Sequence, residues 1–189
     1  VAAGGLTFTA AAALVQKRGR YMAEAVPPGS GLVAAILGLA PDAVRDACRE
    51  ASSVGVVAAA NFNSPGQVVI AGEKAAVEKA IEVAKAKGAR KAIPLPVSVP
   101  VHTPLMKSAA DRLAKDVEAT TWSDLTAPLI NNADAKALRT AAEVKASLIR
   151  QLPSPVLWED SIKAMHGMGV TTNACASRGT VSGSPFPRR

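Results

Sequence analysis

The 189 residues are 49% hydrophobic but only 3% aromatic, which suits one medium domain, or a small domain inserted in part of a larger one. No apolar run approaches the ~20 residues of a membrane span, so we expect no membrane association. The two cysteines, Cys48 and Cys175, form neither a disulfide framework nor a metal-ligand spacing, which predicts a reducing, cytoplasmic compartment. The 22 Lys and Arg against 15 Asp and Glu give a net charge of +7, which favours an anionic partner. Because the chain starts at Val1 and not at Met, we expect a fragment.

The first predicted helix carries an arginine on its apolar stripe. Thr9 is the predicted N-cap, the helix runs to about Ala25, and its stripe is Ala11, Leu14, Val15 and Met22. Arg18 falls on the same stripe, where an unpaired buried charge is costly. Arg18 therefore either forms an internal salt bridge or extends from the helix edge into solvent, or it binds the carboxylate of a ligand through its bidentate guanidinium.

Residues 29–97 show a regular alternation of strands and helices. The predicted strands are Leu32–Leu39, Val56–Ala60, Gln67–Ala71 and Lys91–Val97, and the predicted helices start at Pro41 and span Glu73–Lys87. The turn formers Asn61–Gly66 separate the second and third strands. The order β-α-β-β-α-β predicts an α/β unit of the ferredoxin-like type, with two helices on one face of a four-stranded sheet.

The ferredoxin-like arrangement hosts many functions and selects none by itself. RNA-recognition domains share this topology, but they stack bases on aromatic side chains of the central strands. Leu32–Leu39 and Gln67–Ala71 contain no aromatic residue, so we expect no nucleic-acid partner. A small-molecule regulatory module of the same topology stays open, although it leaves the flanking segments unexplained.

The segment Ile93–Met106 ends in a histidine at the start of a helix. Prolines interrupt its apolar residues, which predicts an edge strand or a strand end. After His102, Thr103 is a predicted N-cap and Pro104 stands at the first helical position. The positive end of the helix dipole disfavours protonation of His102, which then serves either as a neutral base or only as part of the helix cap.

Two helices and a divergent tail are predicted in the C-terminal part. Pro128–Ile130 reads as a strand, and the helix Glu143–Leu152 places Gln151 on its inward face near the helix end. Ser154 and Pro155 are expected to cap a last helix, with Trp158, Ile162 and Met165 as its stripe and His166 at the surface of its last turn. Residues 173–189 lack apolar periodicity, so we expect a disordered tail.

Several motifs resemble those of the malonyl-CoA–acyl carrier protein transacylases of bacterial fatty-acid synthesis, in the same order from about Gly4 to Thr172. They are Gln16-Lys17-Arg18-Gly19-Arg20-Tyr21-Met22, Asn61-Phe62-Asn63-Ser64-Pro65-Gly66-Gln67, Pro94-Leu95-Pro96-Val97-Ser98-Val99-Pro100-Val101-His102 and Arg150-Gln151-Leu152. The resemblance implies an α/β fold, namely a partial α/β-hydrolase-like acyltransferase domain (residues 1–28 and 98–172) with an inserted ferredoxin-like subdomain (residues 29–97).

The resemblance also implies a reaction and its partners. Malonyl-CoA acylates an active serine, and the phosphopantetheine thiol of acyl carrier protein then takes the malonyl group, without a metal or a cofactor. Carried over residue by residue, Arg18 matches the arginine that pairs with the free malonyl carboxylate. His102 matches the general base, and Gln151 the residue whose main-chain carbonyl orients that histidine.

The sequence departs from the family at both ends. It contains no Gly-x-Ser-x-Gly motif for the nucleophile and lacks the glycine-rich segment of the oxyanion hole. Residues 173–179 replace the family's strand and Glu-Val-Gly-Pro-Gly turn, which suggests an altered reading frame near Thr172. We therefore expect no nucleophile in this chain, and no activity of the chain alone. The alternative is a non-catalytic remnant, or a module that binds acyl carrier protein.

Overall fold

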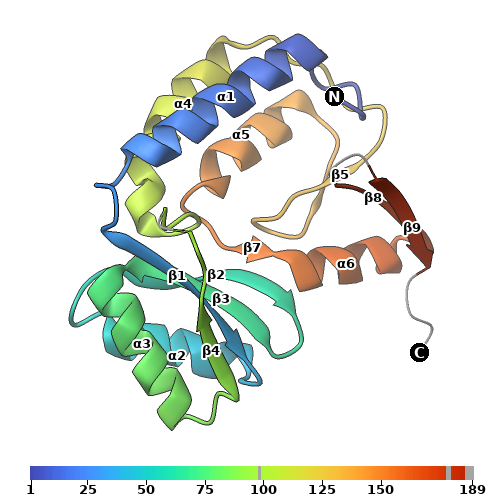
Figure 1. The fold of residues 1–189 in the computed structure, drawn as a ribbon. Coiled ribbons are helices and arrows are strands. Elements are labelled where there is room, and N and C mark those ends of the chain that lie inside the picture. The colour runs from blue at the N-terminus through green and yellow to red at the C-terminus, as the bar shows by residue number, and fades with distance from the viewer. Residues whose placement is uncertain (98, 178–179, 186–189) are drawn as a thin grey trace.

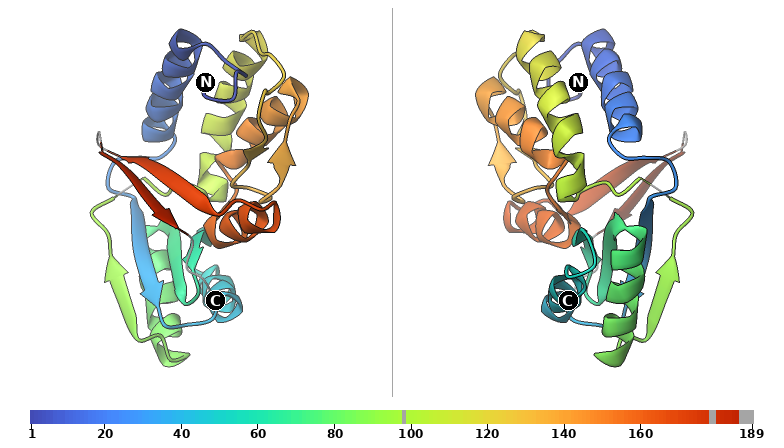
Figure 2. Two further views of the ribbon diagram at one scale, coloured as in Figure 1. Left: turned by 90° about the vertical axis from the view of Figure 1, so that its right-hand side faces the viewer. Right: turned by 90° about the vertical axis from the view of Figure 1, so that its left-hand side faces the viewer.

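The computed structural model describes residues 1–97, 99–177 and 180–185. Most of its helices and strands form two groups (Figure 1). One group contains the helices α1 (Phe8–Glu24), α4 (Lys107–Ala119) and α5 (Ala141–Gln151). The other contains a sheet with α2 (Pro41–Ala51) and α3 (Lys74–Ala86) packed on it. Figure 2 shows from two sides that α6 (Trp158–Gly167) lies between the two groups.

The sheet has five strands in the order β4-β1-β3-β2-β7. The strands β1 (Gly31–Leu37), β2 (Val57–Ser64), β3 (Gln67–Glu73) and β4 (Lys91–Pro94) pair antiparallel. The two-residue strand β7 (Val156–Leu157) adds to β2 in parallel, so the sheet is mixed. The first four strands and the two helices follow the predicted β-α-β-β-α-β order, and β7 is an addition that the sequence pattern did not predict.

Apolar side chains on alternate strand positions separate the two faces of the sheet. Ala34, Ile36, Val68 and Ile70 pack against α2 and α3 in the largest core cluster. Their neighbours on the opposite face form a smaller cluster, which consists of Val33, Ala35, Ala60, Val69 and Ala71 with Leu95 packed against it. Both helices therefore lie on one face, as the sequence predicted.

Two strand boundaries differ from the prediction by three residues or more. The strand β2 continues through the expected turn formers Asn61–Ser64, because Phe62 is 6% exposed and packs in the core beside the helices. The turn shrinks to Pro65 and Gly66, where Gly66 takes a φ of 72°. At the other side of the sheet, β4 ends at Pro94 rather than Val97: Leu95 N still donates to Val33 O at 2.8 Å, but Pro96 has no N–H to donate to a neighbouring strand.

The helix α1 begins earlier than predicted, and its packed side differs from the predicted stripe at Val15. Thr7, not Thr9, is its N-cap, because Thr7 Oγ1 accepts a hydrogen bond of 3.2 Å from Ala10 N. Val15 is 67% exposed, so its place on the predicted buried stripe is wrong. The side of α1 that packs on α4 carries Leu14, Tyr21 and Met22.

Polar contacts fasten α1 to α4. Lys17 Nζ donates to Asp116 Oδ1 at 2.5 Å, and Tyr21 Oη donates to the other oxygen of the same carboxylate at 2.8 Å. The Arg112 guanidinium lies 4.0 Å from the centre of the Tyr21 ring, a distance at which cation–π attraction operates. Because Arg18 lies between Lys17 and Tyr21 in α1, these contacts also fix the position of its backbone.

The helix α5 begins earlier than the sequence pattern indicated, and the helix α6 begins later. A capping box of Thr140 and Glu143 starts α5 at Ala141, two residues before the predicted start. The helix α6 starts at Trp158 and has no side-chain cap, since β7 occupies the residues that follow Ser154 and Pro155. His166 lies exposed in the last turn of α6, as predicted.

Two short two-stranded sheets complete the fold. The strands β5 (Leu129–Ile130) and β6 (Ala137–Leu138) form a small hairpin. The strands β8 (Thr172–Ser177) and β9 (Thr180–Pro185) pair antiparallel within the segment 173–189, for which the sequence predicted a disordered tail; residues 178, 179 and 186–189 of that segment lie outside the described residues. No helix in the described part of the chain is long and apolar enough to cross a membrane.

Candidate functional site

His102 lies in a strained turn between β4 and the 3₁₀ helix η1 (Pro104–Met106), which continues into α4. Its φ is 61°, in the left-handed region that costs a residue with a Cβ about 1–2 kcal/mol. Thr103 occupies the predicted N-cap position, but its buried hydroxyl donates to Pro100 O at 2.7 Å and does not cap the helix. Backbone strain of this kind persists where the surrounding structure fixes one conformation, and it is concentrated at functional sites.

The imidazole of His102 faces two main-chain carbonyl groups through one nitrogen. Nδ1 lies 3.2 Å from Gln151 O and 3.0 Å from Ser154 O. Because both partners are acceptors, Nδ1 carries the proton in the neutral ring and Nε2 keeps its lone pair. The orienting role of Gln151 O was expected from the resemblance, whereas nothing in the sequence pattern indicated Ser154.

Burial is the main cause that lowers the pKa of His102, and the positive charge of Arg18 lowers it further. The hydrogen bonds to the carbonyls of Gln151 and Ser154 oppose this lowering. The helix dipole was the cause expected from the sequence, whereas burial is the leading cause in the structure. At neutral pH the ring is uncharged, which is the form that a general base requires.

Arg18 projects from α1 to the same place. Its side chain is half-buried, and its Nη2 donates to Gln151 Oε1 at 3.4 Å. Burial lowers the pKa of the guanidinium, which stays protonated at any physiological pH because its pKa in water is so high. Among the described residues no carboxylate lies within ion-pair distance of Arg18, so the internal salt bridge that the sequence left open is not formed there.

Gln151 connects the two functional groups. Its side-chain oxygen accepts the hydrogen bond from Arg18, and its main-chain oxygen faces His102. The three residues come from α1, from the turn before η1 and from the last residue of α5, so only the folded chain brings them together. The arrangement pairs an uncompensated cation with a neutral imidazole, which suits proton transfer at a substrate that carries a carboxylate.

No described hydroxyl or thiol is hydrogen-bonded to His102. Ser161 Oγ donates to Leu157 O, and Thr103 is engaged with Pro100. Cys48 is buried under the sheet on α2, and burial raises the pKa of its thiol to about 12, which makes it a poor nucleophile. The described residues also contain no group of three or more His, Cys, Asp or Glu side chains that could hold a metal ion.

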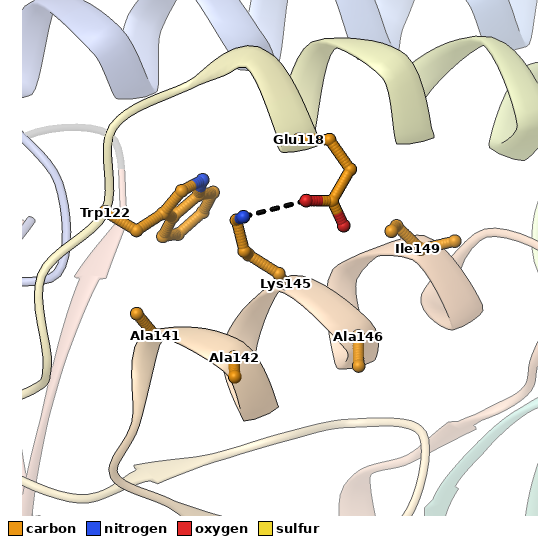
Figure 3. A pocket seen from close by; sticks show the side chains of 7 residues that line it. All are labelled: Glu118, Trp122, Ala141, Ala142, Lys145, Ala146 and Ile149. Carbon is orange, nitrogen blue, oxygen red and sulfur yellow. Dashed lines mark hydrogen bonds and ion pairs between the residues drawn. The ribbon is translucent and has the colours of Figure 1, made fainter.

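Two surface hollows lie away from these residues. One, of about 540 Å³, lies between α4 and α5 and is lined by Glu118, Trp122, Ala141, Ala142, Lys145, Ala146 and Ile149. Figure 3 shows Lys145 reaching from α5 past Trp122 to Glu118, with which it forms an ion pair of 2.8 Å. The other, of about 560 Å³, is largely apolar and is lined mainly by residues 1–6 and 125–129. Neither hollow includes Arg18, His102 or Gln151.

Comparisons with known proteins agree with one another. Residues 1–176 match the model of the acyl transferase domain family. The malonyl CoA-acyl carrier protein transacylase of Salmonella typhimurium is 49% identical over 170 residues, which are 90% of this chain and 55% of that protein. The crystal structure of malonyl-CoA:acyl carrier protein transacylase from Xanthomonas oryzae has a TM-score of 0.88 and 42% identity, and the match covers 90% of this chain and 55% of that one.

A further structural match is a complex of a type II PKS acyl-carrier protein with its malonyl-transacylase. Its TM-score is 0.87 at 45% identity, and the match covers 89% of this chain and 55% of that one. The chain thus spans about half the length of the curated relatives it matches.

Proposed function

This chain belongs to the malonyl-CoA–acyl carrier protein transacylase family, and from that premise we propose that it carries the acyl-binding and proton-transferring part of a malonyl transfer site. The observation that supports this most strongly is that Gln151 contacts both Arg18 and His102. We propose that malonyl-CoA donates the acyl group and that the phosphopantetheine thiol of acyl carrier protein receives it.

In the proposed mechanism His102 moves one proton in each half of a ping-pong reaction. Its Nε2 takes the proton of a serine hydroxyl while the oxygen attacks the thioester carbonyl, and CoA leaves as a thiol after receiving that proton. In the second half Nε2 takes the proton of the carrier thiol, whose sulfur attacks the acyl ester, and the serine oxygen recovers a proton. Gln151 O and Ser154 O accept from Nδ1–H, and they stabilise the imidazolium that forms transiently.

We assign the malonyl carboxylate to Arg18. The guanidinium can form two parallel hydrogen bonds to a carboxylate, and its only described side-chain partner is the neutral amide of Gln151. An acetyl group offers no such anion. The same contact therefore selects for acyl groups with a terminal carboxylate, because an analogue without it leaves a half-buried charge unpaired.

The family suggests how the proposed site is completed. We propose that residues 1–28 and 98–172 belong to a partial α/β-hydrolase-like acyltransferase domain, and that residues 29–97 are its inserted ferredoxin-like subdomain. We propose that the nucleophilic serine lies outside these 189 residues, since they contain no Gly-x-Ser-x-Gly motif. In this proposal the protein works in the cytoplasm, and its net charge of +7 favours an acidic carrier protein.

The missing motif also favours a second candidate function, that of a non-catalytic module which binds acyl carrier protein. A chimera separates the two candidates. In it, the upstream segment of the Salmonella typhimurium relative, with its nucleophile motif, is joined to Val1, and malonyl transfer to acyl carrier protein is measured. Transfer that disappears in His102→Ala supports the catalytic assignment. A folded chimera that binds the carrier protein but transfers nothing contradicts that assignment and supports the module.

A further inference from the structure

The two carbonyl groups that face His102 belong to one short turn. Gln151 is the last residue of α5, and Ser154 lies two residues before β7. Ser154 N donates to Gln151 O at 3.2 Å, which closes the turn and brings both carbonyl oxygens to the same nitrogen of His102. The direction of these carbonyls therefore depends on how the two ends of segment 150–157 are held.

One loop holds both ends of that segment. The loop comprises residues 131–136 and joins β5 to β6. At the upstream end, Arg150 Nη2 donates to Asp134 Oδ2 at 2.7 Å. At the downstream end, Leu157 N donates to Asn132 O at 2.7 Å. Arg150 and Leu157 are thus bound to Asp134 and Asn132, which lie two residues apart in the same loop.

The loop has a defined conformation of its own. Asn131 is 6% exposed; its Oδ1 accepts from Asp134 N at 2.7 Å and its Nδ2 approaches Asp134 Oδ2 at 3.4 Å. Asn131 N donates to Lys136 O at 3.0 Å, and Ala135 takes a left-handed φ of 54°. The Asp134 carboxylate is therefore held in place by its own loop, independently of its contact with Arg150.

We propose that Asp134 is a positioning residue for His102: through Arg150 it fixes the turn 151–154, so that both carbonyls accept from Nδ1 and leave Nε2 free as the base. The side chains of Arg150 and Asp134 are 53% and 37% exposed, and exposed ion pairs contribute little to global stability. We therefore expect the pair to influence the direction of the two carbonyl groups and to change the free energy of unfolding little. The part of this inference that concerns catalysis rests on the proposed function.

The test measures where the proton of His102 lies in the 189-residue chain, by long-range ¹H–¹⁵N NMR of its neutral ring. Arg150→Gln removes the partner of Asp134 at an exposed position and leaves the loop intact. We expect the ratio of the Nδ1–H to the Nε2–H tautomer to fall by about threefold to tenfold, which corresponds to the net contribution of one hydrogen bond. Asp134→Asn should act in the same direction, and exchanging the pair as Asp134→Arg with Arg150→Asp should restore part of the ratio.

Glu118→Gln is the matched control. It removes the ion pair of 2.8 Å between Glu118 and Lys145, which joins α5 to α4. Lys145 lies six residues before Gln151, so this pair is distant from the turn. An unchanged ratio in Arg150→Gln overturns the proposal, and so does an equal change in Glu118→Gln, which would indicate a general loosening of α5. The measurement needs no substrate. Its failure is therefore distinguishable from a chimera that does not transfer malonyl.

Discussion

The amide of Gln151 accepts a hydrogen bond from Arg18 at 3.4 Å, while the carbonyl of the same residue faces His102 at 3.2 Å. One residue thus touches both the cation and the imidazole. We expect a carboxylate bound to Arg18 to compete with the side chain of Gln151 and not with its main-chain carbonyl. In the proposed function, an anionic acyl group would therefore bind Arg18 without displacing the carbonyl that faces His102.

The first prediction is that Arg18→Ala in the chimera lowers malonyl transfer far more than acetyl transfer. A hydrogen bond to a charged group contributes about 1.5–3 kcal/mol, which corresponds to roughly a 10- to 150-fold loss of kcat/KM for malonyl-CoA. Transfer rates from malonyl-CoA and acetyl-CoA give the ratio. Arg20→Ala is the control, because Arg20 lies on the same helix with a side chain that is 62% exposed. Equal losses for both acyl groups would make Arg18 a structural residue.

The second prediction concerns the pH dependence of stability. Burial and Arg18 lower the pKa of His102 below its ordinary 6.5. Between the two pKa values the unfolded chain binds more protons than the folded one, so the free energy of unfolding rises with pH across that window. The contribution of His102 to the free energy of unfolding is complete above pH 6.5, and it is lost as the pH falls through the lowered pKa of the folded state. Urea unfolding of the 189-residue chain at a series of pH values measures it.

His102→Asn is the variant for that experiment, because asparagine tolerates the left-handed backbone that residue 102 adopts. It should remove the His102 contribution, whereas His166→Gln should leave that contribution in place. In the chimera the same His102 variant should slow acylation by about 10²- to 10⁴-fold. A pH profile that is identical with and without His102 would contradict the prediction.

Local signals in the sequence predicted the sheet and its helices well, because a short continuous apolar run such as the one in Gly31–Leu37, and apolar residues at helical spacing, can be read from neighbouring residues alone. Gln151 and Arg18 stood out as polar residues at inward positions. What the sequence could not indicate were the partners across long separations. Ser154 O, the pairing of Asp134 with Arg150 and the addition of β7 to β2 depend on tertiary packing, and the turns involved have no periodicity.

The third prediction is that Cys48 resists alkylation in the folded chain. Burial raises the pKa of its thiol to about 12, so little thiolate forms at pH 8. In a Cys175→Ser variant, iodoacetamide should modify Cys48 only as fast as the unit of sheet and helices opens. Intact mass against time, with and without urea, gives that rate. Rapid labelling without denaturant would show that α2 does not stay packed on the sheet.

The last prediction is that a polypeptide of these 189 residues forms no malonyl adduct when incubated with malonyl-CoA. No described hydroxyl is hydrogen-bonded to His102, and the sequence has no Gly-x-Ser-x-Gly motif to present one. We therefore expect His102 to have no nucleophile to activate within these residues, and Cys48 is buried. Intact mass spectrometry after incubation provides the measurement, and the chimera with its nucleophile motif is the positive control. A stable malonyl ester on any residue of the 189 would place the nucleophile within this chain, and peptide mapping would then identify it.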